Sequence, residues 1–529
     1  MTRRTRLLVL LIFVTIIETL LFAFIPGGWS SYIYVLINKG FYANLCSPSG
    51  MYDQPWNTSL LSNLTTINQT LKNKDEISDA SDAYNAKVEY TVNQSVQTSV
   101  IKKFIASATS NTCREQQEQL HLLYTISVAL LELLTVSWGP LVYRFGVIGP
   151  KVFSMLLFIS GCLMLGLSNP DIPLLVVPGM VLVGVGGLGI VVINMKVSSI
   201  LPFGTGLYVA VLNGACDSSV ITFRIVKLLN EYGVHDLYPF IGIIVLHIIL
   251  SGSSLILHKI LDHPKISSTN EEVPMMETGS KKPNNEEDTA IQLTKKLHKK
   301  RTPTDSEPTV ALKDSLCSFV TFSMMVWVSV LMLYFFSYLG TINSRLQNTI
   351  PNKVSHLTNV MAYIMFGGMV TALVPGSVAE WQMKMFKGRT NSLERSLLPN
   401  IASLVITTIL AVLLNVLAFI ESETVFYVEF AVLTVFRSFL YSSNMAFIVS
   451  AFPITHTNII FPLSLTVGGT LSMIQYAIFA WNNHTVDSRL HVKIFMTVLV
   501  ALSLIHPIVT YLTAKGVLRR TAGSSTEKK

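Results

Sequence analysis

Arg3-Arg4-Thr5-Arg6, followed by Leu7-Leu-Val-Leu-Leu-Ile-Phe-Val-Thr-Ile-Ile-Glu18-Thr-Leu-Leu-Phe-Ala-Phe24, is the stretch that decides the fold class. Three basic residues precede an apolar run that contains one acid and is long enough to cross about 30 Å of hydrocarbon as a helix. Half of the 529 residues are hydrophobic and only 13% are charged, with a mean hydropathy of +0.51. Soluble domains carry about a quarter charged residues. The sequence therefore predicts an all-α membrane protein.

Apolar windows of this kind recur along the whole chain. A search for windows of about 20 residues finds twelve, near residues 7–37, 119–138, 152–168, 174–200, 207–229, 237–258, 316–340, 357–379, 398–420, 424–450, 459–481 and 491–514. The first window is long enough to continue beyond the membrane. It has no Ala-x-Ala cleavage site, so we expect it to be a retained helix rather than a signal peptide.

The connecting segments fall into two groups by charge, and cations near helix ends set the orientation of a membrane protein. The basic group contains Arg3, Arg4, Arg6, Arg144, Lys151, Lys196, Lys384, Lys387, Arg389, Lys515, Arg519 and Arg520, together with the run from Lys295 to Arg301. We expect these segments, and both termini, to be cytoplasmic. This orientation also explains the net charge of +8 without nucleic acid as a partner.

The alternate segments carry glycosylation acceptors, which must lie outside the cytosol. Four sequons begin at Asn57, Asn63, Asn68 and Asn93 in the segment 47–117, and a fifth begins at Asn483. Cys46 and Cys113 bracket the same segment. Because the outer side of the membrane is oxidising, we expect these two cysteines to form a disulfide.

A polar stretch divides the windows into six and six. Residues 259–315 are dominated by Pro, Glu, Asn, Lys and Thr and are too polar to fold alone, so we expect a cytoplasmic linker between a bundle at 1–258 and a bundle at 316–514, with a tail at 515–529. This layout resembles the major facilitator superfamily, whose halves are pseudo-repeats around a midplane site. The resemblance implies a fold of twelve transmembrane helices.

Two short motifs support that resemblance. The segment from Gly139 to Gly146 is similar to the superfamily's inner-loop signature and includes Arg144, although Tyr143 stands where an acid is usual. Gly376-Ser-Val-Ala-Glu380-Trp381, after the eighth window, resembles its degenerate partner in the second half.

Longer strings resemble one family within the superfamily. They are Gly28-Trp-Ser-Ser31, Gly40-Phe-Tyr-Ala-Asn-Leu-Cys46, Asn213-Gly-Ala-Cys-Asp217-Ser-Ser219 and Arg437-Ser-Phe-Leu-Tyr441-Ser-Ser-Asn444. By these strings the chain is identified as a member of solute carrier family 43, which holds system-L large neutral amino acid facilitators and an equilibrative nucleobase transporter. The resemblance implies a sodium-independent uniporter of the plasma membrane that works by alternating access on a small-molecule substrate, without a cofactor.

The choice of substrate rests on one block. The sequence from Asn213 to Ser219 is more similar to the nucleobase branch of the family than to the amino acid branch. We therefore expect purine nucleobases as the substrate, with large neutral amino acids as the alternative. The arginine at position 224 differs from the sequence pattern of both branches. A non-transporting sensor on a carrier fold is the second alternative.

Three ionisable residues lie near the middles of their windows. An ionisable side chain at the centre of a membrane helix costs about 2.5–3.5 kcal/mol on insertion scales, so Glu18, Asp217 and Arg437 each need a partner, water or a function. Arg437 is the expected partner of Asp217. The residues leave three roles open: a structural ion pair, a gating or substrate role, and proton coupling, the last of which the family resemblance disfavours.

Neutral polar residues form the other candidate set for substrate contact. Those in or beside the expected central cavity are Asn194, Asn213, Tyr334, Tyr441, Ser442, Ser443, Asn444 and Gln475. An uncharged purine needs an aromatic face and a few amides, whereas a zwitterionic amino acid needs a cation and an acceptor, which Arg437 and Asp217 could supply. Each amide is equally compatible with a helix–helix hydrogen bond.

Other function classes lack their motifs. The sequence contains no Gly-x-Ser-x-Gly, His-Glu-x-x-His or acidic metal cluster, so we expect neither an enzyme nor a metal site. Five glycines between Gly179 and Gly189 favour close helix packing or a hinge. The run from Lys295 to Arg301 is compatible with contact to anionic membrane lipid.

Overall fold

The computed structural model describes residues 3–46, 112–201, 205–262 and 312–517, and every regular element among them is helical. The first half contains α1 (Arg3–Phe22), α2 (Trp29–Asn38), α5 (Arg114–Thr135), α6 (Trp138–Phe145), α7 (Ile148–Leu167), α8 (Val176–Asn194), α9 (Thr205–Ser218), α10 (Ile221–Glu231) and α11 (Leu237–Asp262). Short 3-10 turns lie at Ile25–Gly28, Ala43–Leu45, Pro173–Leu175 and Met195–Ser199.

The second half begins with the short α13 (Leu312–Leu316). It continues with α14 (Phe319–Thr349), α15 (Val354–Phe366), α16 (Gly368–Thr371), α17 (Leu373–Phe386), α18 (Ser392–Leu417), α19 (Glu423–Ala451), α20 (Ile454–Leu471), α21 (Gln475–Asn482), α22 (Val486–Leu502) and α23 (Ile505–Ala514). Turns of 3-10 helix lie at Pro351–Lys353 and Ser472–Ile474.

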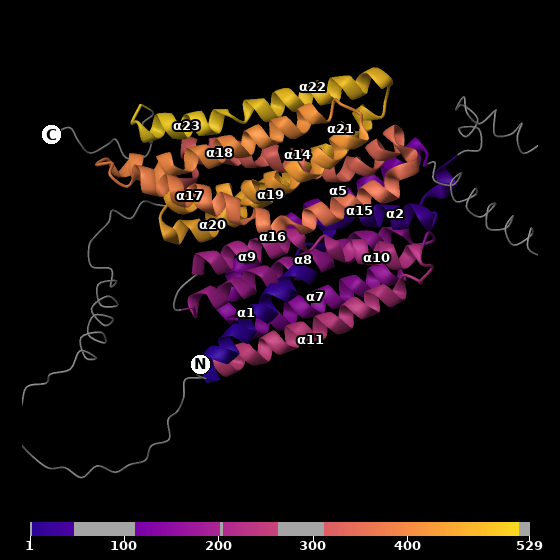
Figure 1. Cartoon of the computed structure of the whole chain (residues 1–529), viewed down its shortest axis with the longest axis horizontal. Helices are drawn as coiled ribbons and strands as arrows, with labels where there is room; N and C mark the ends of the chain where they lie inside the picture. The colour runs from indigo at the N-terminus through magenta and orange to yellow at the C-terminus, as the bar shows by residue number, and fades with distance from the viewer. Residues whose placement is uncertain (1–2, 47–111, 202–204, 263–311, 518–529) are drawn as a thin grey trace, which may run out of the picture.

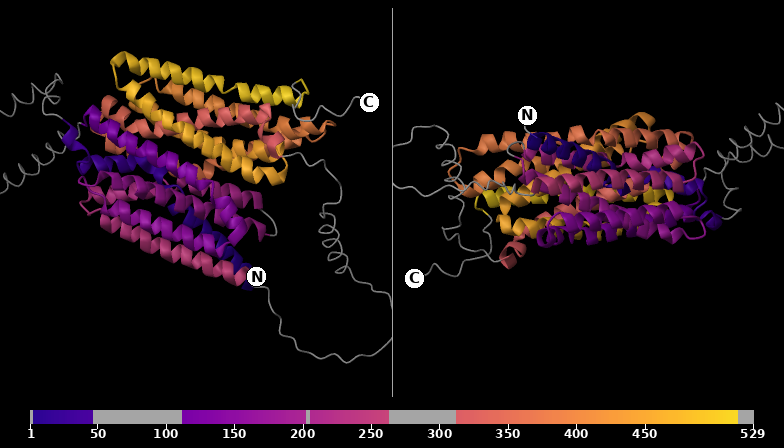
Figure 2. Two further views of the ribbon diagram at one scale, coloured as in Figure 1. Left: turned by 180° about the vertical axis from the view of Figure 1, so that it is seen from behind. Right: turned by 90° about the horizontal axis from the view of Figure 1, so that it is seen from below.

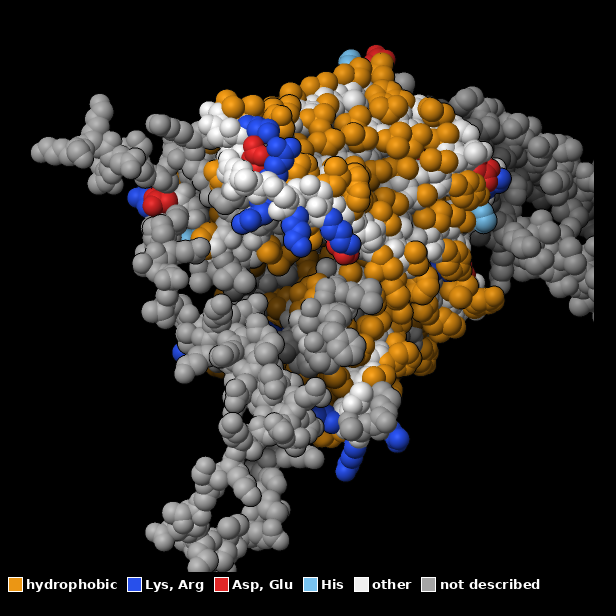
Figure 3. All heavy atoms as spheres, turned by 60° about the vertical axis from the view of Figure 1, so that its left-hand side comes forward, with side chains coloured by type: hydrophobic (Ala, Val, Ile, Leu, Met, Phe, Trp, Pro, Cys, Tyr) orange, Lys and Arg blue, Asp and Glu red, His pale blue; other side chains and the backbone are white. Residues whose placement is uncertain are grey.

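The two halves are bundles that lie side by side, with their helices roughly along one direction (Figures 1 and 2). The start of α1 and the end of α23 lie at one end, which we call the termini end. The end of α2 and the start of α5 lie at the other end, which we call the disulfide end. Cys46, just after the turn that follows α2, and Cys113, at the start of α5, are joined there by a disulfide with a Cα–Cα distance of 5.5 Å. Hydrophobic side chains cover much of the flank, and Lys and Arg gather near the termini end (Figure 3). The protein is an all-α membrane protein with the six-plus-six arrangement.

The twelve predicted windows are matched by twelve helical segments that are long and apolar enough to span a membrane among the described residues. The expectation of one long first helix is wrong, because the segment breaks at Ile25–Gly28 and continues as α2, which is largely buried. Pro26 has no backbone N–H to donate and so ends the helix. A Cβ on Gly28 would lie 2.6 Å from the Val220 carbonyl oxygen, so only glycine permits this approach to α10.

Breaks recur at equivalent places in the two halves. The second spanning segment is divided between α5 and α6, and the eighth is divided between α15, α16 and α17. The fifth is divided between α9 and α10, and the eleventh between α20 and α21. Interrupted segments at corresponding positions of two repeats point to the substrate site of a transporter.

The first inner-loop motif lies on a helix, which differs from the expected loop. Gly139 and Arg144 belong to α6, and Gly146 ends it with φ +70°, a conformation that favours glycine. In the second half Glu380 lies on α17 and pairs with Lys384 at 2.9 Å. The acid of the second motif is therefore paired on its own helix.

The glycines of α8 serve close packing. A Cβ on Gly187 would lie 2.2 Å from the Phe22 carbonyl oxygen and 2.3 Å from that of Ala23. The α8 helix runs from Val176 to Asn194 without interruption, so the hinge interpretation has no support from a break.

Gly187→Ala is therefore expected to destabilise the first half. The added methyl group must displace the backbone of α1, and overpacking of this kind costs about 1–3 kcal/mol. Gly242→Ala on α11 is the matched control, because a Cβ there meets nothing within 4 Å. Thermal unfolding of the purified variants checks the difference, and equal midpoints would contradict the packing account.

Candidate functional site between the two halves

An ion pair joins the two halves at the end of α9. Arg437 on α19 places its Nε 2.9 Å from Asp217 Oδ1 and donates from Nη1 to the Asp217 backbone oxygen at 3.1 Å. Ser438 donates to Asp217 Oδ2 at 3.4 Å. The Arg437 side chain is 3% exposed and that of Asp217 13%. The structure thus brings together the two charges that the sequence suggested as partners, on helices 220 residues apart in the chain.

Aromatic rings cover the arginine. Its guanidinium lies 4.9 Å from the centre of the Phe24 ring and 5.7 Å from that of Phe335. Phe24 lies at the break between α1 and α2, where its N–H donates to Ser219 at 2.7 Å. The interrupted first and fifth segments therefore form one side of the site.

The break in the eighth segment forms the opposite side. Ser218 donates to the Phe366 carbonyl at 2.6 Å and accepts a hydrogen bond from the N–H of Met369 at 3.1 Å. Ser218 thereby satisfies backbone groups that a helix end leaves free. A Cβ on Gly368 would lie 2.9 Å from Asp217 Cβ, so glycine is needed at this contact.

Glu132 on α5 is a buried acid that the sequence reasoning missed. It is 5% exposed, and its carboxylate has no hydrogen bond or ion pair within the described ranges. It lies within electrostatic range of Tyr441, Tyr124 and Cys216. A Cβ on Gly469 of α20 would lie 2.2 Å from Glu132 Cβ, so the acid sits where the two halves touch. An acid within an apolar window was the signal available, as for Glu18.

Two further predicted residues lie on the same faces. Asn213 precedes Asp217 by one helical turn on α9, and Tyr441 follows Arg437 by one turn on α19, so each pair shares a face. Both Asn213 and Tyr441 are partly exposed. We define the midplane site as Glu132, Asn213, Asp217, Arg437 and Tyr441.

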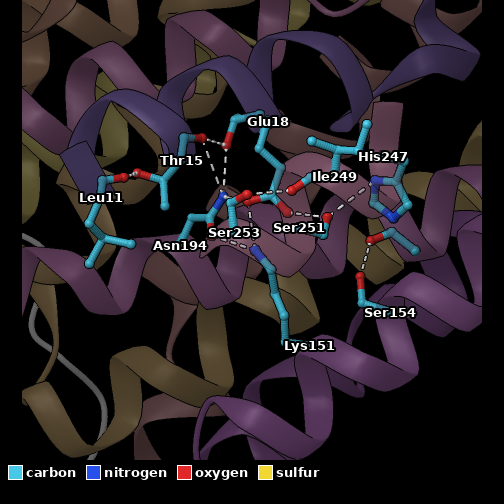
Figure 4. A network of polar contacts seen from close by, with 12 residues as sticks. Leu11, Thr15, Glu18, Lys151, Ser154, Asn194, His247, Ile249, Ser251 and Ser253 are labelled. Atoms are coloured by element: carbon cyan, nitrogen blue, oxygen red, sulfur yellow. Dashed lines mark hydrogen bonds and ion pairs between the residues drawn. The ribbon is translucent and has the colours of Figure 1, made fainter. Parts of the chain in front are cut away.

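Glu18 and Asn194 lie elsewhere, inside the first half (Figure 4). Lys151 donates to Glu18 Oε2 at 2.6 Å and to Asn194 Oδ1 at 2.9 Å, and Asn194 Nδ2 donates to the same Glu18 oxygen at 3.1 Å. Ser251 of α11 donates to the other carboxylate oxygen. These four side chains are fully buried and join α1, α7, α8 and α11. This arrangement favours a structural role for Glu18 and Asn194.

The assignment of Lys151 to a cytoplasmic loop is wrong. Lys151 belongs to α7, and its side chain is 0% exposed. A lysine at the start of an apolar window looks like a flanking charge, but its long side chain reaches back into the bundle to the acid of another helix. Lys227 of α10 is likewise fully buried, and it donates to Thr358 across the halves at 2.6 Å.

Two predicted amides lie within the second half. Asn444 is fully buried and donates to Ser464 of α20 at 2.9 Å, a helix–helix hydrogen bond. Gln475 is 1% exposed, and neither of its amide atoms has a hydrogen-bond partner in the described chain. The structure does not bring either residue to Asp217.

The disulfide ends of the halves are tied together by hydrogen bonds. Gln117 of α5 donates to Gln347 of α14 at 3.0 Å and accepts from Ser344 at 2.6 Å. At the termini end, by contrast, Tyr143 is 90% exposed and Trp381 58%. These two residues belong to α6 and α17, the equivalent ends of the second and eighth segments.

The glycosylation acceptors Asn57, Asn63, Asn68 and Asn93 fall outside the described residues. Asn483 caps the end of α21 and accepts a hydrogen bond from Asn482 at 3.2 Å. It lies at the turn to α22, at the disulfide end (Figure 1). Among the described residues no group of three or more His, Cys, Asp or Glu side chains could hold a metal ion.

The midplane site combines a neutralised ion pair with a free acid and a phenol. Asp217 and Arg437 compensate each other's charge, so the pair presents little net charge to a ligand. Glu132, Tyr441 and Asn213 offer hydrogen-bond acceptors and donors beside it. Such a set suits recognition of a small polar molecule at the joint of two halves.

Comparisons with known proteins find two kinds of transporter among the relatives of this chain. The chain is 27% identical over 410 residues to "Equilibrative nucleobase transporter 1" of Bos taurus, which covers 75% of this chain and 84% of that protein. It is 20% identical over 540 residues to "Large neutral amino acids transporter small subunit 3" of Homo sapiens, which covers 88% of this chain and 86% of that protein. No family model matches the chain.

A solved structure with a similar course of the chain is an auto-inhibited POT family peptide transporter. It has a TM-score of 0.49 at 12% identity, covering 79% of this chain and 92% of that one.

Proposed function

We propose that this chain belongs to the solute carrier family that contains the equilibrative nucleobase transporter and the large neutral amino acid transporters, and that it is a facilitative, sodium-independent carrier of purine nucleobases. The protein is a multi-pass membrane transporter of small molecules and not an enzyme. The similarity to the nucleobase transporter over three quarters of the chain carries the choice of substrate.

The charge balance at the midplane site supports an uncharged substrate. A zwitterionic amino acid needs a cation for its carboxylate and an acceptor for its amine. Here Arg437 and Asp217 already neutralise each other, so a zwitterion would have to break a largely buried pair, which is costly. A purine needs only hydrogen-bond partners and an aromatic face, which Glu132 and Tyr441 are placed to provide.

Alternating access explains the contrast between the two ends. Cross-half hydrogen bonds hold the disulfide end closed, whereas aromatic residues of α6 and α17 are exposed at the termini end. We propose that the disulfide end is extracellular and the termini end cytoplasmic. The charges support this, because Lys and Arg gather near the termini end (Figure 3) and cations near helix ends favour the cytoplasmic side. The proposed location is the plasma membrane.

Large neutral amino acids remain the second candidate substrate. The observation in their favour is the similarity to transporters of that name from Homo sapiens and Mus musculus. In that case Arg437 would leave Asp217 and bind the substrate carboxylate.

Parallel uptake of labelled adenine and labelled leucine by cells that express the chain tests the proposal. We expect adenine uptake above that of cells without the chain, and no leucine uptake. Leucine uptake alone would move the chain to the amino acid branch. No uptake of either, with the chain at the cell surface, would favour a sensor.

A further inference from the structure

A polar pocket outside the midplane site lies in the second half, and its lining residues Ser344 and Phe479 also contact α5 of the first half. It is lined by α14, α18, α21 and α22. Tyr334 and Gln475, which are buried, lie at its deep end, and Asn348 and Arg489 lie at the exposed mouth at the disulfide end. Its volume is about 120 Å³, whereas one water needs roughly 10–15 Å³. The pocket therefore has room for a small heterocycle.

The deep end of this pocket holds polar groups without partners. Four side-chain atoms have no hydrogen-bond partner in the part of the chain that the structure describes. They are Nε2 and Oε1 of Gln475, Oη of Tyr334 and Oγ of Ser337. These side chains are 1%, 4% and 8% exposed, respectively. Buried polar groups are nearly always hydrogen-bonded, and each exception needs an explanation. A ligand that supplies the missing donors and acceptors is such an explanation.

Two of the cations that line the pocket, Arg345 and Lys493, are each paired with an acid. Arg345 donates to both oxygens of Glu429, at 3.0 and 3.1 Å, and Tyr338 donates to Glu429 at 2.8 Å. Nearer the mouth, Lys493 pairs with Glu421 at 3.2 Å. Arg489 at the mouth has no ion pair among the described residues. Beyond it, a charged ligand would have to displace one of these partners, so the deep end of the pocket suits an uncharged molecule.

The free amide of Gln475 narrows the chemistry further. It offers one donor and one acceptor side by side, the pattern that pairs with the adjacent acceptor and donor on the edge of adenine. The rings of Tyr338 and Phe479 line the same pocket and can contact a flat ligand. The ring of Tyr334 lies 6.3 Å from that of Phe436, which lies 6.4 Å from the ring of Phe335 beside Arg437. These aromatic rings connect the deep end of the pocket to the midplane site.

We propose that this pocket is a second purine-binding site, which a nucleobase occupies from the disulfide end in addition to the midplane site. The inference rests on the proposed function, because it takes the same class of substrate. Gln475 binds the polar edge of the base, and Tyr334 and Ser337 satisfy its remaining polar atoms.

The test is equilibrium binding of labelled adenine to the purified full-length chain. We expect two sites in the native chain. Gln475→Leu removes both amide contacts and should weaken the second site about tenfold or more, since each lost hydrogen bond is worth a several-fold change in affinity. Val492→Phe fills the same pocket from α22 without changing the amide and should have the same effect.

Gln382→Leu is the matched control. Gln382 is also a buried glutamine with an unpartnered Oε1, but it lies on α17, outside the pocket. Two sites in this variant and one in the other two would support the proposal. Two outcomes would contradict the second site while leaving the proposed function in place, provided that adenine transport is intact. One is a single binding site in the native chain, and the other is two binding sites in both pocket variants. Absence of any adenine binding by folded native chain would overturn the proposed function as well.

Discussion

Arg437→Ala is expected to lower adenine transport about a hundredfold while the chain still reaches the cell surface. The variant leaves the Asp217 carboxylate without its cation at the junction of α9, α16 and α19. An unpaired charge in this setting costs about 3–5 kcal/mol. The cost falls on contacts between the halves, which must reform in each transport cycle. Uptake normalised to surface abundance measures the effect, and Asp217→Asn should act in the same direction.

A double variant separates the possible roles of this pair. Asp217→Asn with Arg437→Gln removes both charges, so no uncompensated charge remains. If the pair acts in gating or substrate contact, the double variant regains surface abundance but not transport. Native transport by the double variant would assign the pair a structural role only. Full activity of both single variants would contradict any role of the Asp217–Arg437 pair in transport.

Lys151→Met is expected to have the largest effect on stability. Glu18 would remain fully buried with no cation, although Asn194 and Ser251 still donate to it. Breaking a buried pair in this way costs about 3–5 kcal/mol. We expect loss of most of the chain from the cell surface and a lower thermal midpoint in detergent.

Removing both partners should reverse much of that loss. Glu18→Gln with Lys151→Met leaves no buried charge, so this double variant should be more stable than Lys151→Met alone. Lys384→Met is the control, because Lys384 is 73% exposed and its pair with Glu380 contributes little. Equal stability of Lys151→Met and the native chain would contradict the structural role of the network.

Much of the fold was predictable from the sequence because the bilayer imposes one length on every apolar segment. That rule locates all twelve spans but does not predict breaks in the apolar windows, such as the one at Ile25–Gly28. Pro26 and Gly28 give a local signal. The close approach of Val220 from another helix, which requires glycine at position 28, is contained in no local pattern.

The candidate site was predictable only in part. The cost of a charge in the membrane pointed to Asp217 and Arg437, and the structure brings them together. The same cost applies to Glu132, which lies inside a counted window and was overlooked. The insertion cost alone does not tell a structural acid from one at the interface. Glu18 is paired within the first half, whereas Asp217 is paired across the junction of both halves, and this depends on which helices are neighbours.

The most direct test of the central claim is counterflow in liposomes that contain the purified full-length chain. Liposomes preloaded with unlabelled adenine are supplied with labelled adenine outside, with and without sodium and proton gradients. A carrier that works by alternating access should take up the label faster when preloaded, and neither gradient should matter. Accumulation of adenine driven by either gradient, or counterflow with leucine but not with adenine, would contradict a facilitative nucleobase carrier.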